Sequence, residues 1–280
     1  MAGTLYLVGT PIGNLGDISP RALETLETVD FIAAADTRVT LKLLNRFGIK
    51  KQLVCYFEHN RAEMGEKLLA RLLAGESCAL VTDAGMPAIS DPGEDIVRQC
   101  AARGVPVLAV PGPTALATAL ALSGLPTQRF CFEGFLAAAG KTRREHLESL
   151  RGEKRTMVFY EAPHKLLRTL QDLLEVLGDR DVALCRELTK LHEEVIRTTL
   201  SEAAARFAET PPRGEFVLVV RGAPEDAGPG MTEDEALALV AKYEAGGMRR
   251  KDACRRAAQE SGYTANLLYQ RALDAEKQKE

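Results

Sequence analysis

The stretch Cys78–Gly93, CALVTDAGMPAISDPG, decides the fold, because it joins a short apolar strand to a long loop rich in glycine and proline. The loop also carries two hydroxyls and two carboxylates, and a helix begins near Glu94. Glycine lets a backbone approach a ligand closely, and proline fixes the shape of a loop in advance. An ordinary strand–helix connection needs only about two to six residues. The stretch therefore predicts a ligand-binding loop at the carboxyl end of a strand in an open α/β sheet.

The first 125 residues alternate apolar strands with amphipathic helices. We expect strands at 5–8, 31–34, 53–56, 79–81 and 107–110. Ser19 followed by Pro20 is a good start signal for the first helix, since serine caps helices and proline suits the first turn. This alternation predicts a mostly parallel, doubly wound sheet over residues 1–125. Neither GxGxxG nor GxxxxGK[ST] occurs, so dinucleotide and P-loop fingerprints do not apply.

Beyond Pro126 the pattern changes, and we place a domain joint near Gly124–Pro126. Residues 126–222 predict a second α/β domain with more antiparallel pairing. Residues 223–231 are a linker by composition, and residues 232–280 predict a small helix-turn-helix-like unit of three helices. The fold class is therefore α/β, with two α/β domains and a C-terminal helical unit.

Composition limits the function classes. The chain is 46% apolar and 27% charged with a formal net charge of −3, so a polyanion site would have to be a local patch. No apolar run approaches the roughly 18 residues that span a bilayer, so no membrane partner is expected. Six widely spaced cysteines without a CxxC pair, and four histidines without ligand spacing, predict reduced thiols in a cytoplasmic protein and no metal site.

Seven motifs occur in order along the chain: VGTPIGNLGDIS, AADTR, TDAGMPAISDPG, VPGPTA, FYEAPH, RELTKLHEEV and GEFVLVV. Together they closely resemble the tetrapyrrole methylase superfamily of S-adenosylmethionine-dependent methyltransferases, and within it the branch that methylates ribosomal RNA. The resemblance covers residues 4–222 nearly continuously, and the three-helix unit looks like an appendage of that branch. It implies a homodimer that holds the cofactor between two α/β domains. It also implies methylation of a cytidine ribose 2′-hydroxyl in the decoding region of 16S ribosomal RNA, with the 30S subunit as the expected context.

The resemblance also implies the residues that bind S-adenosylmethionine. They are Pro11, Asp83, Gly85, Met86, Ile89, Ser90, Pro111, Thr114, Ala115, Tyr160, Glu161, Leu188, Gly214 and Glu215. Met86 is a departure, because relatives that act on tetrapyrroles have aspartate there, which leaves Asp83 or Ser90 to supply the polar contact. A sulfonium ligand needs an apolar slot and polar partners, and its positive charge is better tolerated near a carboxylate than near a cation.

A ribose hydroxyl is too weak an acid to ionise alone near neutral pH, so we expect a proton acceptor. Glu161, Glu187 and Lys190 are the catalytic candidates, with Glu193 and His164 also near the cleft. Glu161 is slightly favoured, although a carboxylate at a strand end equally suits helix capping or a salt bridge. Lys190 could act only if burial depressed its pKa.

Lysine and arginine contacts to phosphate supply most of the affinity for RNA. The candidate RNA-binding residues lie on loops, on helix starts and on the middle helix of the C-terminal unit: Arg38, Arg61, Lys141, Arg143, Arg144, Arg249 and Arg250. Each of them alone is equally consistent with a solvated surface charge.

Two other functions stay open at this point. A small-molecule methylase acting on a tetrapyrrole precursor would share the fold and cofactor, but Met86 and the added basic helical unit argue against it. An RNA-binding or assembly module with a vestigial cleft is a different class. The intact PGPTA and DAGMPAISDPG loops argue against that class, because a lost ligand would not require them.

Overall fold

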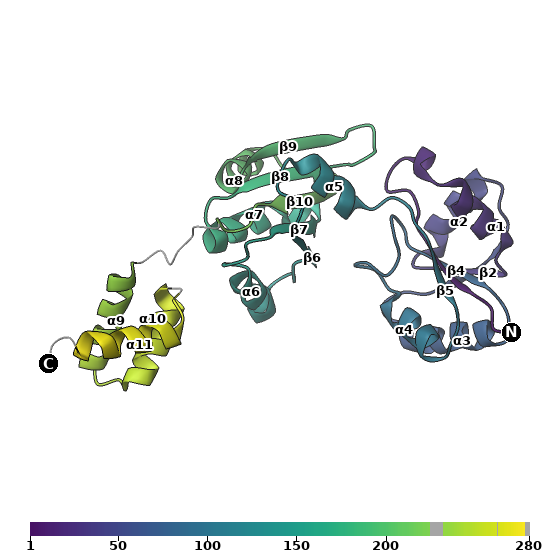
Figure 1. Ribbon diagram of the computed structural model, residues 1–280. Helices are drawn as coiled ribbons and strands as arrows, with labels where there is room; N and C mark the ends of the chain where they lie inside the picture. Colours follow the sequence, from purple (N-terminus) through teal and green to yellow (C-terminus); the bar gives the residue numbers. More distant parts are fainter. Residues whose placement is uncertain (225–231, 262, 278–280) are drawn as a thin grey trace. The chain divides into compact units, whose positions relative to one another are not determined.

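A computed structural model describes residues 1–224, 232–261 and 263–277 (Figure 1). Most of the predicted linker, residues 225–231, lies outside the described residues. The chain divides into two compact units, Met1–Gly222 and Ala223–Glu280, and each is described by itself below.

The first unit opens with a fully parallel five-stranded sheet in the order β3-β2-β4-β1-β5. Its strands are β1 (Leu5–Val8), β2 (Phe31–Ala34), β3 (Gln52–Cys55), β4 (Cys78–Val81) and β5 (Val107–Val110). All residues of β2 and β4 are buried, as expected for strands covered on both faces. The predicted parallel, doubly wound sheet is therefore confirmed.

Helices cover both faces of this sheet (Figure 1). One face carries α1 (Pro20–Thr28) and α2 (Thr37–Arg46), and the other carries α3 (Arg61–Leu73) and α4 (Glu94–Ala102). A short 3-10 helix, η1 (Leu15–Asp17), lies in the loop after β1. The Ser19 side chain accepts a hydrogen bond from the backbone N–H of Ala22, which confirms the predicted start of α1.

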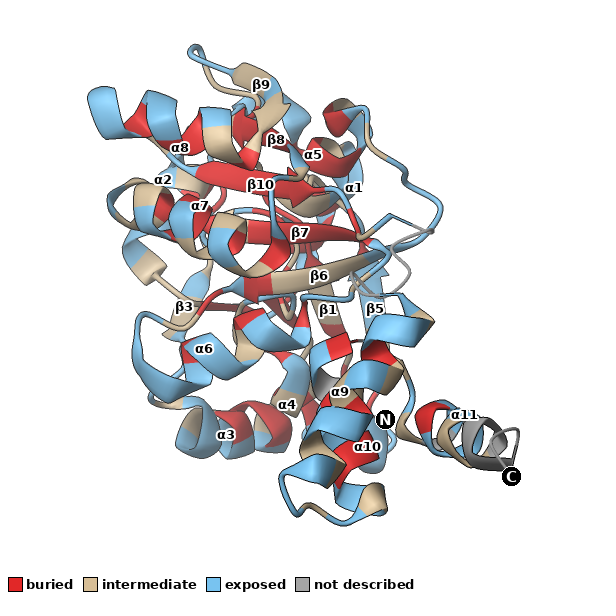
Figure 2. Cartoon of the chain, turned by 90° about the vertical axis from the view of Figure 1, so that its left-hand side faces the viewer, coloured by how far each residue is buried: buried red, intermediate tan, exposed pale blue. Residues whose placement is uncertain are grey.

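The second sheet is mixed, in the order β6-β7-β10-β8-β9. Its strands are β6 (Phe130–Phe135), β7 (Thr156–Glu161), β8 (Asp181–Arg186), β9 (Glu194–Thr199) and β10 (Phe216–Val220). β6 pairs with β7 in parallel, whereas every other neighbouring pair is antiparallel, as the sequence predicts. The central strands β7 and β10 are almost wholly buried (Figure 2).

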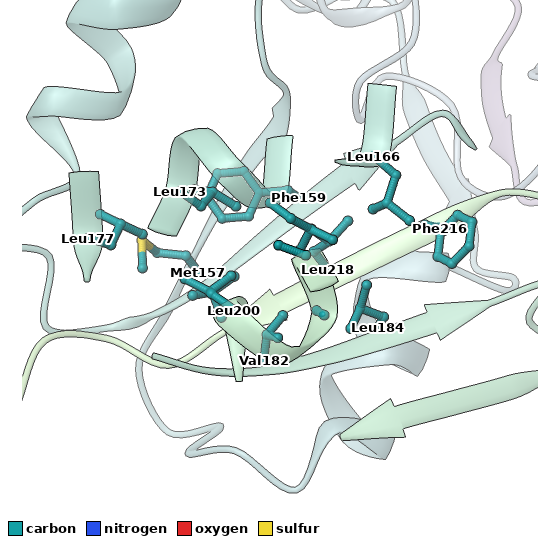
Figure 3. Packing of buried hydrophobic residues seen from close by; sticks show 14 of the residues in the cluster. Met157, Phe159, Leu166, Leu173, Leu177, Val182, Leu184, Leu200, Phe216 and Leu218 are labelled. Carbon is teal, nitrogen blue, oxygen red and sulfur yellow. The ribbon is translucent and has the colours of Figure 1, made fainter. Parts of the chain in front are cut away.

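One face of the second sheet packs against α6 (Gly140–Ser149), α7 (Pro163–Leu177) and α8 (Leu200–Glu209). Side chains from β7, β8 and β10 interdigitate there with leucines of α7 and α8 (Figure 3). Dense packing of this kind supplies most of the stability of a domain.

The opposite face is covered by α5 (Ala115–Ser123), which precedes the predicted domain joint. Ala119 and Leu120 of α5 are buried against the outward side chains of β7, β8 and β10. The sequence of α5, ALATALALS, is apolar on nearly every side. Such a helix has to be buried against other apolar side chains and is unsuited to a solvent-exposed connection between domains. The chain therefore passes from one sheet to the other through residues 111–114, before α5.

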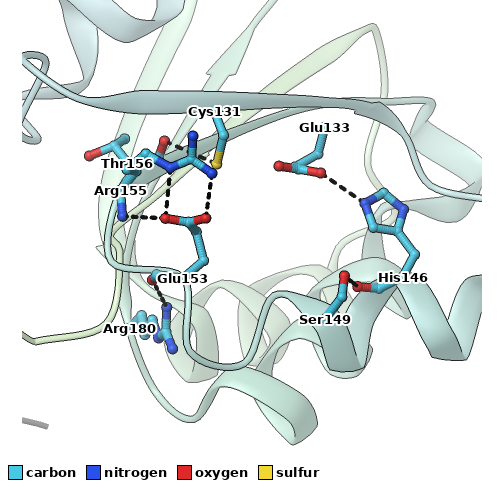
Figure 4. A network of polar contacts seen from close by, with 8 residues as sticks. All are labelled: Cys131, Glu133, His146, Ser149, Glu153, Arg155, Thr156 and Arg180. Atoms are coloured by element: carbon cyan, nitrogen blue, oxygen red, sulfur yellow. Dashed lines mark hydrogen bonds and ion pairs between the residues drawn. The ribbon is translucent and has the colours of Figure 1, made fainter.

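A polar cluster fixes the loop between α6 and β7 (Figure 4). Arg155 donates to both oxygens of the Glu153 carboxylate, and its backbone N–H donates to Oε1. The hydrogen bond from the Arg155 side chain lowers the pKa of Glu153 to about 2. Nearby, His146 Nε2 lies 2.9 Å from a carboxylate oxygen of Glu133.

The second unit contains α9 (Glu233–Ala245), α10 (Arg250–Ser261) and α11 (Ala265–Lys277). Thr232 and Glu235 form a capping box at the start of α9. Its core is small and alanine-rich: Ala236, Val240, Ala253, Cys254, Ala257 and Leu268.

Within the described ranges, no helix is both long and apolar enough to cross a bilayer. The same residues contain no cluster of histidine, cysteine, aspartate and glutamate suited to a metal ion.

Candidate functional site

A cavity of about 570 Å³ lies in the first unit, where loops of the parallel sheet meet strand ends of the mixed sheet. The parallel sheet contributes Ile12 and the loop after β4, and α5 contributes its first turn. The mixed sheet contributes the ends of β6, β7 and β8 and the start of β10. The loops after β1 and β4 are joined by two backbone hydrogen bonds between Thr10 and Gly85, of 2.9 and 3.0 Å. The predicted ligand loop therefore forms one wall of this cavity.

Close backbone approach explains the glycines at this end of the sheet. A Cβ on Gly9 would lie 2.7 Å from the Cα of Gly112 and 2.8 Å from the Sδ of Met86. The loops after β1 and β5 therefore touch through glycine, and the Met86 thioether packs on the same spot. Met86 therefore has a packing role beside Gly9.

All but three of the predicted cofactor-binding residues line the cavity. Those that do are Asp83, Gly85, Met86, Ile89, Ser90, Thr114, Ala115, Tyr160, Glu161, Leu188 and Glu215. Pro11 instead lines a smaller neighbouring cavity, and Pro111 is exposed. A Cβ on Gly214 would lie 2.6 Å from Cγ of Glu187, so this glycine makes room for that side chain.

Backbone strain is concentrated in the two loops that border the cavity. Ala88, Ser90, Glu187 and Thr189 have φ values between 50° and 65°, and they are the non-glycine residues of the described chain with positive φ. Such conformations cost on the order of 1–3 kcal/mol each and persist where the surrounding structure imposes them. The surrounding structure thus holds both loops in strained conformations that lower local stability, as is common at functional sites.

Two aromatic rings form an apolar wall. The ring centroids of Phe135 and Tyr160 lie 5.6 Å apart, and the Tyr160 hydroxyl accepts a hydrogen bond from the backbone N–H of Leu116. Burial raises the pKa of Tyr160, so the phenol stays neutral. Phe135 is 58% exposed although it is aromatic, which fits a ligand-facing position. No pattern in the sequence marks Phe135 as a site residue, because a strand-end phenylalanine is normally part of a core.

Two carboxylates border the cavity on the loop after β4. Burial raises the pKa of Asp83 and of Asp91. The charge of Asp36 adds to the rise at Asp83, and the charge of Asp83 adds to the rise at Asp91. Oδ1 of Asp83 accepts a hydrogen bond of 3.1 Å from the backbone N–H of Asp36. Asp91 is a further lining residue that the motif comparison does not single out.

Glu161 lines the cavity, but its carboxylate is already bound within the protein. Its side chain is 4% exposed, Oε2 accepts from the Thr169 hydroxyl at 2.5 Å, and Oε1 accepts from the backbone N–H of Ala162. Both oxygens are therefore engaged within the protein, one by the residue that precedes α7 and the other by a side chain of α7.

Lys190 does not have the depressed pKa that a base would need. Its Nζ lies 2.9 Å from Oε1 of Glu187 and 2.8 Å from Oε2 of Glu215. Partial burial opposes the positive charge, but hydrogen bonds and charges of the two glutamates outweigh it and raise the pKa of Lys190. The backbone N–H of Glu215 and the Lys190 ammonium lower the pKa of Glu187. The depressed pKa that Lys190 would need for proton abstraction is therefore not found. Lys190 instead forms a charged bridge with Glu187 and Glu215 at the cavity edge.

Arg143 is wrongly predicted to contact RNA. Its side chain is 4% exposed, and it donates to Oδ2 of Asp172, to the carbonyl of Ala137 and to the hydroxyl of Thr169. The neighbouring Arg144 is exposed. A helix start that reads as uniformly basic therefore contains one internal arginine, which the helical period turns toward α7.

The other candidate RNA-binding cations are exposed or half-buried, and most are paired with acids. Arg38 pairs with Asp36, Arg61 with Glu58, Lys141 with Glu145 and Arg250 with Glu244. Arg249 is exposed at the start of the basic helix. Pairing of this kind reduces the positive field around these four cations.

The sequence profile of the Tetrapyrrole (Corrin/Porphyrin) Methylases matches residues 4–204. Curated relatives with the name "Ribosomal RNA small subunit methyltransferase I" are similar over nearly the whole chain. The relative from Synechocystis sp. is 50% identical and covers 98% of this chain and 99% of its own length. The relative from Escherichia coli O157:H7 is 46% identical, and the match covers 97% of this chain and 95% of the relative. The Thermotoga maritima relative is 50% identical and covers 79% of this chain and 99% of its own.

Solved structures share the fold at low identity. A diphthine synthase superposes with a TM-score of 0.62 and 17% identity, covering 78% of this chain and 90% of its own. The uroporphyrin-III C-methyltransferase of Thermus thermophilus complexed with S-adenosylhomocysteine gives a TM-score of 0.54 and 21% identity, covering 78% and 97%. The motifs, the paired sheets and the matched profile agree, and the chain belongs to the tetrapyrrole (corrin/porphyrin) methylase family.

Proposed function

We propose that the chain uses S-adenosylmethionine to methylate the ribose 2′-hydroxyl of a cytidine in the decoding region of small-subunit ribosomal RNA. The observation that carries this proposal is the cavity of about 570 Å³, lined by the loops that the motifs identify. Full-length similarity to ribosomal RNA methyltransferases supports RNA as the substrate class.

The lining suits a sulfonium nucleoside. Phe135, Ile89 and Leu188 offer apolar surface for an adenine ring. Asp83 and Asp91 offer carboxylates to ribose hydroxyls and to the positive sulfonium. Cys185 is another wall residue, and burial raises the pKa of its thiol to about 11, so it remains neutral and apolar at this place.

Chemically, the bound cofactor supplies an electrophilic methyl group, and the protein supplies position. The charged bridge of Lys190 with Glu187 and Glu215 closes one edge of the cavity. Glu161 and Tyr160 fix the starts of α7 and α5, so the first turns that line the cavity keep their shape. Alignment of this kind lowers the barrier by holding reacting atoms near their contact distance.

The proposal includes the partners. We expect a homodimer that acts on 16S ribosomal RNA, in the assembled 30S subunit, and therefore in the cytoplasm. The similarity to ribosomal RNA methyltransferases supports the RNA partner. Exposed Arg144 and Arg249 are the described candidate cations for which phosphate contact fits best.

The test incubates the protein with methyl-labelled S-adenosylmethionine and 30S subunits from a strain that lacks the gene. After digestion to nucleosides, we expect the label in 2′-O-methylcytidine. Parallel reactions with protein-free 16S RNA decide between naked RNA and the particle. No label in RNA, with cofactor binding intact by calorimetry, would refute the proposal and favour a small-molecule methylase.

Matched variants on one helix connect the activity to the cavity. Ala115 lines the cavity, whereas Ala121 on the same helix is exposed away from it. We expect Ala115→Leu to weaken cofactor binding and abolish labelling, and Ala121→Leu to leave both unchanged. Equal effects of the two substitutions would contradict the assignment of this cavity to the cofactor.

A further inference from the structure

A second cavity, of about 240 Å³, adjoins the cofactor cavity. It lies between the loop after β1 and helix α2, and its floor includes Thr82 and Asp83 at the end of β4. The same two residues line the larger cavity. The two cavities therefore meet at one carboxylate. Of the residues that line the smaller cavity, the motifs assign only Pro11 and Asp83 to a ligand, in both cases the cofactor.

The walls of this second cavity combine apolar and basic groups. Leu15 and Val39 are large apolar side chains left exposed, and Leu43 lies beside them. Lys42 and Arg46 stand at its rim and are exposed to solvent, and neither forms an ion pair with any residue that the structure describes. Apolar walls accept the face of a base, and unpaired cations accept phosphate.

The basic groups follow a regular line along α2. Arg38, Lys42 and Arg46 are four residues apart, so they share one face of the helix over two turns. A line of cations beside an apolar pocket is the pattern expected for a single strand whose backbone runs along the helix while one base turns inward.

Size limits what can enter. A cavity of about 240 Å³ is smaller than the roughly 300–1,000 Å³ typical of sites for drug-sized ligands. A tetrapyrrole macrocycle is too large for this cavity, whereas a single unstacked nucleoside has a suitable size.

Asp83 is the carboxylate best placed to serve both cavities. Oδ1 accepts the hydrogen bond from Asp36, while Oδ2 has no partner among the described residues. The carboxylates of Glu161 and Glu187 are each bound by other protein groups. Charged groups facing Asp83 are Asp36 and Arg38 from the start of α2 and Asp91 from its own loop.

We propose that the second cavity holds the target pyrimidine nucleoside, that Lys42 and Arg46 bind its flanking phosphates, and that Asp83 accepts the proton of the ribose hydroxyl. This inference rests on the proposed function. The ribose oxygen forms a bond to the methyl carbon while the methyl–sulfur bond breaks. The electron pair of that bond stays on sulfur, and the hydroxyl proton passes to Oδ2 of Asp83, so the charges balance.

The decisive variants are Val39→Phe and Leu41→Phe. Both side chains lie on α2 and are 39% and 49% exposed, but only Val39 lines the second cavity. We expect Val39→Phe to lower kcat/KM for 30S subunits by about 100-fold, because the ring displaces the nucleoside. Calorimetry with S-adenosylhomocysteine should give the wild-type Kd for both variants, and Leu41→Phe should keep wild-type activity.

Two further readouts separate the roles. Asp83→Asn should lower kcat by about 10²–10⁴-fold while the KM for 30S subunits stays near that of the wild type. Lys42→Ala and Arg46→Ala should weaken 30S binding. Each should also reduce the slope of log Kd against the logarithm of the salt concentration by about one.

The outcomes distinguish the two proposals. If the unaltered protein methylates 30S RNA but Val39→Phe behaves like Leu41→Phe, the second cavity is not the nucleoside site. If Asp83→Asn keeps wild-type kcat, Asp83 is not the proton acceptor. If the unaltered protein methylates no RNA, the proposed function fails, and this inference fails with it.

Discussion

Replacing Arg143 by methionine removes a buried guanidinium and keeps most of the aliphatic stem. The guanidinium connects α6 to α7 through Asp172 and Thr169, and it also binds the carbonyl of Ala137. The Thr169 hydroxyl in turn donates to Glu161 at the cavity wall. The substitution therefore leaves three acceptors without their donor.

The size of the effect follows from burial. Removing one partner of a buried ion pair costs roughly 3–5 kcal/mol. The Asp172 side chain is 28% exposed, so water replaces part of the lost interaction. We therefore expect the free energy of unfolding to fall by about 3 kcal/mol. At about 2–4 °C per kcal/mol for a domain of this size, Tm should fall by roughly 6–12 °C.

Urea unfolding followed by circular dichroism measures this loss, with Arg144→Met as the matched control. Arg144 is the exposed neighbour, so its substitution should change the free energy of unfolding by no more than about 0.5 kcal/mol. If Arg143 bound RNA instead, Arg143→Met would keep wild-type stability and lose RNA affinity. That result would refute the argument from burial.

Four other substitutions test separate parts of the first unit. Tyr160→Phe leaves a backbone N–H of α5 without its acceptor, so the unfolding free energy should fall by about 1–3 kcal/mol in urea titrations. Glu153→Gln should lower the free energy of unfolding at pH 7 relative to the wild type. Because the hydrogen bond from Arg155 depresses the pKa of Glu153 from 4.5 to about 2, this stabilisation is fully present above pH 4.5 and is lost as the pH falls toward 2. The difference from the wild type should therefore shrink over that window, and a constant difference would contradict the assignment. Gly9→Ala should abolish cofactor binding in calorimetry because its Cβ meets backbone at 2.7 Å, whereas Gly65→Ala in α3, with nothing nearer than 3.5 Å, should raise Tm by stabilising the helix by about 0.5–1 kcal/mol.

Local signals in the sequence predict the elements well. The strands 5–8, 31–34 and 107–110 and the helix beginning at Glu94 occur with the expected bounds. Caps also act locally: Ser19 and the Thr232 capping box bind the backbone groups that their spacing predicts. These features depend on residues a few positions apart, so a single sequence contains the information.

Features that depend on distant residues were not predictable in this way. The burial of Arg143 requires Asp172 and Thr169 to arrive from another helix. The raised pKa of Lys190 requires Glu215, which immediately precedes the distant strand β10. Likewise, α5 joins the second sheet because of the apolar face that the sheet presents to it. In each case the sequence identifies the residue type but not its partner.

Residues 111–114 connect the two sheets, and Thr114 also lines the cavity of about 570 Å³ that we propose for the cofactor. The chain has no other covalent route between the sheets, so the connector and part of the binding surface are the same few residues. A ligand bound there holds the connecting segment in its folded conformation. At a free concentration of 100 times its Kd, the ligand would stabilise the folded chain by about 2.7 kcal/mol. Protease cleavage within 111–114 should therefore slow as cofactor is added. Through this one segment, the concentration of the cofactor would set how fast proteases degrade the protein.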